Sequence, residues 1–153
     1  MSQTPQIYSS LTLEDKVSEL GKLTEWVASL AERIGAGKRD KFRFDLAVTE
    51  AVTNVIMHGL PDESERLIRT EASFEEGSLA ISIIDSGIPF DPLTAPVKER
   101  PTSLAEATPG GAGLLLIRAY CDDASYEYSN GENRLTLIFQ IKEAGENQSG
   151  ASS

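Results

Sequence analysis

Three groups of residues in this sequence have types and spacings that suit the binding of a charged ligand. Glu50 and Asn54 stand four residues apart, so on a helix their carboxylate and carboxamide would project from one surface. Asp85 is followed two residues later by Gly87, and a second glycine cluster, GGAG, occupies positions 110–113. Glycines at the start of a helix let a phosphate approach backbone N–H groups, and the helix dipole favours its charge.

Glu50 and Asn54 would lie on a helix over residues 45–59, ending at His58 and Gly59. The helical spacing of its apolar residues predicts a buried stripe: Phe44, Val48, Ala51, Val52 and Val55. Polar groups beside such a stripe cost about 1–3 kcal/mol each when buried and unpaired. Two interpretations stay open at this point, a ligand site or a helix edge that meets water.

Asp85 ends a predicted strand on the side that should be buried. Its parity matches Leu79, Ile81 and Ile83, whereas Ser82 lies on the other side. An acid that continues the core-facing row favours a functional role, because a buried charge needs a partner. The alternative is an aspartate in a strand-end turn, which is common.

The glycine cluster follows a long segment, residues 88–108, with four prolines and no sustained period. About 20 structureless residues are unusual in a compact domain unless they form a lid or binding loop. After the glycines, residues 114–120 read as a buried helix. GGAG alone is also compatible with packing or a turn.

The other elements must position these residues. The pattern predicts a strand over residues 7–13, with Thr12 as the cap of a helix that runs from about Val17 to Ile34. Alternating residues predict two hairpins, one over residues 68–84 and one over residues 124–141 with a turn at 129–131. The predicted order is helix, hairpin, lid, helix, hairpin.

Composition limits the classes of function. The 153 residues suit one domain, 40% are hydrophobic, and the formal net charge of −10 disfavours nucleic-acid binding. No apolar run approaches the ~20 residues that span a bilayer, residues 1–10 lack a signal-peptide pattern, and the single Cys121 cannot form an internal disulfide. We therefore expect a cytoplasmic protein without membrane contact, with one domain over residues 1–142 and a flexible tail over residues 143–153.

With these elements in order, residues 7–142 resemble the GHKL (Bergerat-type) ATP-binding superfamily of gyrase, chaperone, histidine kinase and mismatch-repair ATPases. More narrowly, TEAVTN at 49–54 with His58-Gly59, Asp85-Ser-Gly87, and Gly110-Gly-x-Gly113-Leu114 are similar to bacterial anti-sigma-factor serine/threonine kinases. The resemblance implies a histidine-kinase-like ATPase fold: a two-layer α/β sandwich whose mostly antiparallel sheet is covered on one face by helices, with an ATP lid.

The resemblance also implies a role for each matching residue. Asn54 would bind the Mg²⁺ ion that bridges the phosphates of ATP, since a carboxamide oxygen suits this cation. Asp85 would accept a hydrogen bond from the adenine amino group, and Gly87 would leave room for the base. Glu50 would be the general base, which acts on a protein hydroxyl in a kinase or on water in an ATPase.

The glycine box would wrap the phosphates through the backbone of Gly110, Gly111, Gly113 and Leu114. Two departures from the family pattern bear on this site. Pro89 stands where a second glycine is common, and the box has no cation of its own. The negative charge of the phosphates would then be neutralised by Mg²⁺, by the helix dipole and by Lys98 or Arg100 from the lid.

The predicted function is that of an ATP-dependent serine/threonine kinase acting as an anti-sigma factor. By resemblance it would phosphorylate an anti-anti-sigma (STAS-type) protein, sequester a sigma factor and form a homodimer. Two alternatives remain: a nucleotide-gated binding module with little kinase activity, or an ATPase that uses Glu50 on water.

Overall fold

The computed structural model describes residues 6–58, 66–93 and 113–141 of the chain, with the backbone alone for residue 58 and residues 113–116. In chain order its elements are β1 (Ile7–Glu14), the 3₁₀ turn η1 (Val17–Glu19), α1 (Leu20–Arg33), α2 (Lys38–His58), β2 (Leu67–Glu75), β3 (Ser78–Asp85), α3 (Gly113–Tyr120), β4 (Asp123–Ser129) and β5 (Glu132–Gln140). No helix in these ranges is long and apolar enough to cross a membrane.

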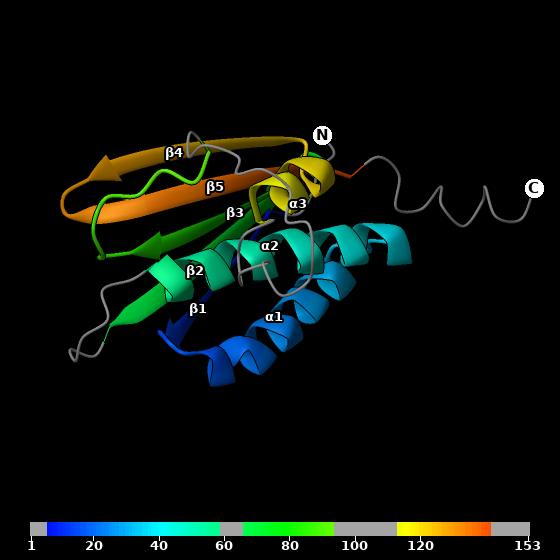
Figure 1. The fold of residues 1–153 in the computed structure, drawn as a ribbon. Coiled ribbons are helices and arrows are strands. Elements are labelled where there is room, and N and C mark those ends of the chain that lie inside the picture. Colours follow the sequence, from blue (N-terminus) through cyan, green and yellow to red (C-terminus); the bar gives the residue numbers. More distant parts are fainter. Residues whose placement is uncertain (1–5, 59–65, 94–112, 142–153) are drawn as a thin grey trace, which may run out of the picture.

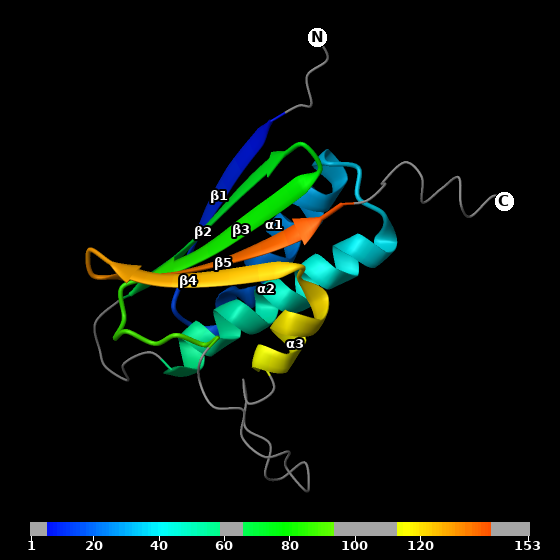
Figure 2. The ribbon, with the colours of Figure 1, turned by 90° about the horizontal axis from the view of Figure 1, so that it is seen from above.

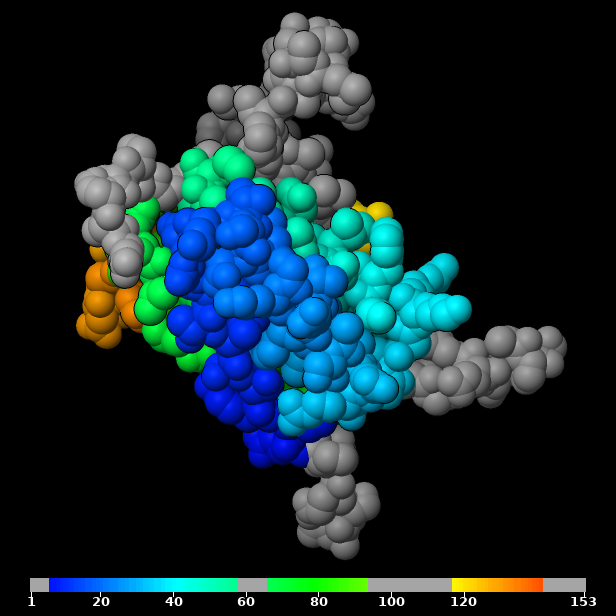
Figure 3. Space-filling view, turned by 90° about the horizontal axis from the view of Figure 1, so that it is seen from below, coloured from blue at the N-terminus to red at the C-terminus, as the bar shows by residue number. Residues whose placement is uncertain are grey.

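The five strands form one antiparallel sheet in the order β1-β2-β3-β5-β4. All three α-helices lie on the same face of this sheet, with α2 between α1 and α3 (Figures 1 and 2). From the helical side, α1 and α2 cover the sheet next to each other (Figure 3). The predicted two-layer α/β sandwich is confirmed.

The core lies between α2 and the central strands, as the sequence pattern predicts. Leu79, Ile81 and Ile83 of β3 are at most 1% exposed, and so are Phe44, Val48, Ala51 and Val52 on the facing stripe of α2. The Phe44 ring meets the Phe139 ring of β5 edge to face, with centroids 4.9 Å apart. This packing directs one edge of α2 toward the ends of β3 and β5.

Two tight turns close the hairpins. Glu76 and Gly77 have φ of 53° and 79°, and Asn130 and Gly131 have φ of 54° and 77°. Two successive residues with positive φ are typical of hairpin turns that match the twist of the strands. The predicted hairpins are therefore confirmed, and the second turn sets the register in which β4 pairs with β5.

The start of the first helix differs from the prediction. Thr12 does not cap a helix but pairs with Arg69 inside the β1–β2 ladder. The Glu19 carboxylate instead accepts the Glu14 N–H at 3.0 Å, and a 3₁₀ turn precedes α1. Strand pairing with β2 outweighs the local capping preference.

Arg43 joins three elements at the far end of the helical layer. Its guanidinium forms an ion pair with Asp40 at 3.0 Å and donates to the backbone carbonyl oxygens of Tyr120 and Gln140. The same group lies over the Phe139 ring, 5.7 Å from its centroid. Arg43 thereby ties α2 to the end of α3 and to the end of β5.

Candidate functional site

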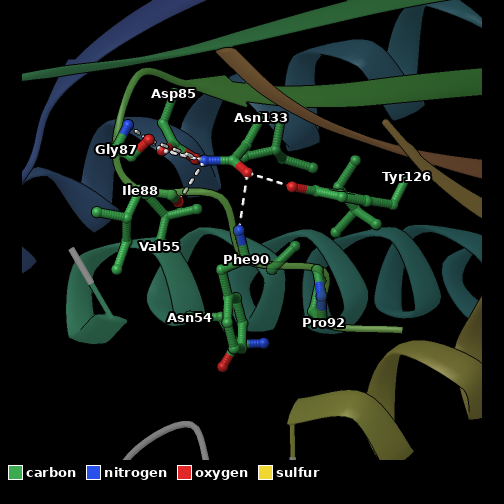
Figure 4. Close-up of a pocket in the computed structure, with 12 residues that line it drawn as sticks. Asn54, Val55, Asp85, Gly87, Ile88, Phe90, Pro92, Tyr126 and Asn133 are labelled. Carbon is green, nitrogen blue, oxygen red and sulfur yellow. Dashed lines mark hydrogen bonds between the residues drawn. The ribbon is translucent and has the colours of Figure 1, made fainter. Parts of the chain in front are cut away.

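A pocket lies where the C-terminal half of α2 approaches the end of β3 and the start of β5. Asn54 comes from α2 and Asp85 from the end of β3, and Gly87 and Pro92 belong to the segment that follows. Asp85 and Asn54 lie on opposite sides of the pocket (Figure 4). Three predicted site residues, Asn54, Asp85 and Gly87, are thus brought together.

The Asp85 carboxylate is held through one of its two oxygens. Oδ1 accepts the backbone N–H of Gly87 at 2.8 Å and the side-chain amide of Asn133 at 3.2 Å. Within the described ranges no donor is hydrogen-bonded to Oδ2. A fixed carboxylate with one free oxygen can accept a hydrogen bond from a ligand donor.

Gly87 is a glycine for steric reasons. A Cβ at this buried position would lie 3.0 Å from Asp85 Oδ1 and 3.1 Å from Arg66 Nη1. Arg66 Nη2 in turn lies 3.7 Å from Asp15 Oδ2. The pKa of the Asp15 carboxyl is raised, because burial and the nearby Asp85 raise it more than Arg66 lowers it. The turn after Asp85 is therefore packed on both sides.

Asn54 carries the clearest sign of a missing partner. Its side chain is only 7% exposed, and Oδ1 is buried without a hydrogen-bond partner among the described residues. An unsatisfied buried acceptor costs about 1–3 kcal/mol and calls for a functional explanation. A carboxamide oxygen is a suitable ligand for Mg²⁺, so the donor atom fits the predicted metal.

Glu50 lies one turn before Asn54 on α2, half-buried. Burial raises the pKa of its carboxyl above the ordinary 4.5. It does not belong to the pocket wall that the described residues form. Its raised proton affinity suits a general base.

The remaining predicted phosphate contacts are only partly described. Gly110, Gly111, Lys98 and Arg100 lie outside the described residues. Gly113 begins α3 and Leu114 follows it, both with the backbone alone described. The predicted glycine box leads into α3, which packs against α2, the helix that carries Asn54.

Two residues of this site were missed from the sequence: Asn133 on β5 and Tyr126 on β4. Asn133 is 6% exposed and hydrogen-bonded to Asp85, and the Tyr126 hydroxyl donates to Asn133 Oδ1. Asn133 lies 48 residues from Asp85 in sequence. Only the register of β3 against β5, which pairs these two residues, reveals the contact.

Comparison with known families and proteins gives a consistent result. The histidine kinase-like ATPase domain family matches residues 13–139. The serine/threonine-protein kinase BtrW of Bordetella bronchiseptica is 30% identical over 73% of this chain and 79% of its own length. The anti-sigma F factor of Clostridium beijerinckii is 32% identical over 60% of this chain and 64% of its own.

A third relative covers nearly the full length: the serine-protein kinase RsbW of Listeria innocua is 28% identical over 89% of this chain and 95% of its own. Among solved structures, the RsbU and RsbW domains of a Mycobacterium tuberculosis protein superpose with a TM-score of 0.64 at 21% identity. That match covers 92% of this chain, which spans 33% of the mycobacterial one, and it shows a shared fold.

Proposed function

The chain belongs to the histidine kinase-like ATPase domain family, and from this membership we propose that it is an ATP-dependent serine/threonine protein kinase of the anti-sigma type. The family match agrees with the membership predicted from the sequence. Relatives named serine/threonine-protein kinase, serine-protein kinase and anti-sigma F factor support the kinase activity and the anti-sigma role.

The adenine base would bind at Asp85. The Oδ2 oxygen of its carboxylate, which has no hydrogen-bond donor among the described residues, can accept a hydrogen bond from the adenine amino group. The family resemblance implies that Gly87 would leave room for the base. The phosphates would then extend toward Asn54 and the start of α3, where the backbone of Gly110, Gly111, Gly113 and Leu114 would hold them. Lys98 or Arg100 could add positive charge.

The metal proposal depends on the orphaned oxygen of Asn54. Bound Mg²⁺ would neutralise phosphate charge and orient the γ-phosphate, and Asn54 Oδ1 would be its ligand from the protein. Asn54 lies on α2 and lines the pocket, so its carboxamide would be available to the metal when nucleotide binds.

Glu50 would act on the acceptor serine. As the serine Oγ bonds to the γ-phosphorus, the bond between that phosphorus and the β–γ bridging oxygen breaks and ADP leaves. The hydroxyl proton passes to Glu50, whose raised pKa makes it a stronger base than an ordinary glutamate. Most of the rate enhancement would come from positioning and charge neutralisation.

The proposed partners are a sigma factor and an anti-anti-sigma protein. Relatives named anti-sigma F factor and serine-protein kinase RsbW support these two classes of partner. We further propose that the substrate is of the STAS type, that the kinase is a homodimer and that it acts in the cytoplasm. The resemblance to bacterial anti-sigma-factor kinases implies all three properties.

One observation carries the proposal: a buried carboxamide oxygen without a partner among the described residues lies across one pocket from a carboxylate with a free oxygen. One end of this pocket suits a cation and the other suits a hydrogen-bond donor. Mg²⁺ bound to a nucleotide supplies both. The spacing of the two groups on α2 and β3 follows from the core packing.

The product that receives the γ-phosphate of ATP tests the proposal. The protein is incubated with γ-labelled ATP, Mg²⁺ and a STAS-type candidate from the same genome, in parallel with Glu50→Gln. Label on an acceptor serine that disappears in the variant supports the kinase. Free phosphate without labelled protein would identify an ATPase, and tight ATP binding with neither product would identify a binding module; each of these overturns the kinase assignment.

A further inference from the structure

One buried side chain organises the segment that carries the Asp85 site. Asn133, at the start of β5, makes hydrogen bonds with five groups (Figure 4). Its Nδ2 donates to Asp85 Oδ1 at 3.2 Å, Gly87 O at 3.4 Å and Ile88 O at 2.9 Å; its Oδ1 accepts from Phe90 N at 3.1 Å and from the Tyr126 hydroxyl. This engages both N–H groups and the carbonyl oxygen of the carboxamide.

Asn133 replaces strand pairing where that pairing ends. Asp85 and Asn133 are the last paired residues of the β3–β5 ladder. Beyond them the chain turns away over residues 86–90 and no longer pairs with β5, so its backbone groups need other partners. The Asn133 carboxamide satisfies three of these groups and so fixes the shape of the turn.

The carboxamide also fixes which oxygen of Asp85 is available. Asn133 Nδ2 and the Gly87 N–H both donate to Oδ1, so Oδ2 is the oxygen left without a hydrogen-bond donor among the described residues, on a side chain that lines the pocket. We propose that Asn133 is a positioning residue that sets adenine affinity, and the preference for adenine over guanine, by holding Asp85 in this orientation. The inference rests on the proposed function, in which Asp85 binds the base.

Tyr126 determines the orientation of the Asn133 carboxamide. Its hydroxyl and the Phe90 N–H are both donors, so they require the oxygen of Asn133 on their side and leave the nitrogen toward Asp85. Burial raises the pKa of Tyr126, and nearby Asp91 and Asp85 raise it further against a lowering contribution from the Phe90 backbone. The hydroxyl therefore remains protonated and donating at neutral pH.

Base preference follows from this chain of contacts. Adenine presents an amino group where guanine presents a carbonyl oxygen, and a carboxylate oxygen accepts only from the first. If Asn133 no longer holds Oδ1, the Asp85 carboxylate can rotate. The resulting loss of affinity then falls mainly on the complex with the adenine nucleotide. The weakly bound guanine nucleotide has no such contact to lose.

The test measures dissociation constants for ADP and GDP by isothermal titration calorimetry with Mg²⁺. We expect Asn133→Ala to weaken ADP binding about tenfold or more and GDP binding by less. Tyr126→Phe should weaken ADP binding about two- to fivefold, because only one donor is lost. Thr136→Ala is the matched control: Thr136 is also on β5 and its hydroxyl bonds Ser82 at 2.9 Å on the opposite face of the sheet.

Asp85→Ala, alone and combined with Asn133→Ala, separates positioning from a structural role. If Asn133 acts through Asp85, removing it in the Asp85→Ala background should change ADP affinity less than about twofold. Equal loss with and without Asp85, equal loss for ADP and GDP, or wild-type ADP affinity in Asn133→Ala would overturn the inference while the proposed function stands.

If Asp85→Ala itself binds ADP as tightly as the wild type, the proposed function and this inference both fail. Should Asn133→Ala not fold, Asn133→Asp keeps the shape and replaces the donors by acceptors that face Asp85 Oδ1 and the carbonyl oxygens of Gly87 and Ile88. We expect it to lose ADP affinity at least as strongly. Wild-type ADP affinity in Asn133→Asp would also overturn the inference.

Discussion

At the scale of single residues, Asn54 connects stability with function. Its Oδ1 is buried without a partner among the described residues, an arrangement that a stability requirement alone does not explain. In the proposed site the same atom meets Mg²⁺ when nucleotide binds. The unsatisfied oxygen therefore destabilises the folded protein slightly, and binding of the ligand would remove this penalty.

We predict that Asn54→Leu leaves the thermal midpoint unchanged or raises it, because an unsatisfied acceptor is replaced by an apolar side chain of similar size. The same variant should lose the Mg²⁺ dependence of ADP affinity. Thermal denaturation and calorimetric titration of ADP with Mg²⁺ or with EDTA measure the two effects. Full retention of the Mg²⁺ enhancement would exclude Asn54 as the metal ligand.

Glu50 makes a prediction about pH. Burial raises its pKa, so the ionised base is lost as pH falls through a value above 4.5, and phosphoryl transfer should decline with it. Measured between about pH 5 and 8, turnover should rise with pH in the wild type and stay low and flat in Glu50→Gln. Nucleotide affinity should be similar in both proteins.

Turnover in Glu50→Gln equal to that of the wild type would remove Glu50 from the mechanism. Lost nucleotide affinity in the same variant would point to a structural role for this carboxylate. Glu50→Asp provides a further comparison, because it keeps the charge and shortens the reach by one methylene group.

How far a residue of the site could be predicted depends on how local its signal is. Asn54 follows from helical spacing and Asp85 from strand parity, and both are readable within a few neighbours. Asn133 and Tyr126 were missed because their partners lie far away in sequence. Their importance appears only once the register places Asn133 opposite Asp85.

At the scale of elements, the turn after β3 depends on the absence of a side chain at Gly87. We predict that Gly87→Ala weakens ADP binding about tenfold, because its Cβ would displace Asp85 Oδ1 or the Arg66 guanidinium. Gly21 in α1 is the matched control, because a Cβ added there would meet no heavy atom within 4 Å. Gly21→Ala should keep ADP affinity and stabilise the protein by about 0.5 kcal/mol.

Calorimetric titration and urea unfolding measure these two effects. Wild-type ADP affinity in Gly87→Ala would show that the tight turn is not needed for binding. A destabilised Gly21→Ala would contradict the description of that position as open space.

The boundaries of the elements show where strand pairing overrides local sequence patterns such as helix caps. The hairpins, the apolar stripe of α2 and the inward side of β3 were predicted, because each repeats a period over several residues. The helix α2 begins at Lys38 rather than at residue 45, and Ser82 and Ile84 on the other side of β3 are buried as well. The first helix starts later than predicted, since residues near Thr12 and Glu14 extend β1 along β2. Such strand pairing is non-local, and capping patterns do not contain it.

At the scale of the whole molecule, the core packing explains how the site is preorganised. The apolar stripe of α2 and the inward rows of β3 and β5 exclude water over most of their length. Their ends then bring Asn54, Asp85 and Asn133 to one pocket. The predicted family and fold are confirmed, whereas residues 1–142 as a single domain remain a prediction.

We predict that a chain ending at Lys142 unfolds in one transition with the same urea midpoint and ADP affinity as the full chain. The reason is that the predicted tail, residues 143–153, contains no large apolar side chain that could join the core. Equilibrium unfolding and calorimetry check this. A lower midpoint or a weaker ADP complex in the shortened chain would assign these residues to the domain.

Binding of an adenine nucleotide to this pocket through Asp85 can be tested with the ADP and GDP affinities of Asp85→Asn. Because Gly87 N–H and Asn133 Nδ2 require an oxygen at the Oδ1 position, the new carboxamide would present its NH₂ group to the base. We predict that ADP binding weakens about 10- to 100-fold, whereas GDP binding weakens less or improves. Unchanged ADP affinity in Asp85→Asn would show that Asp85 does not bind the base.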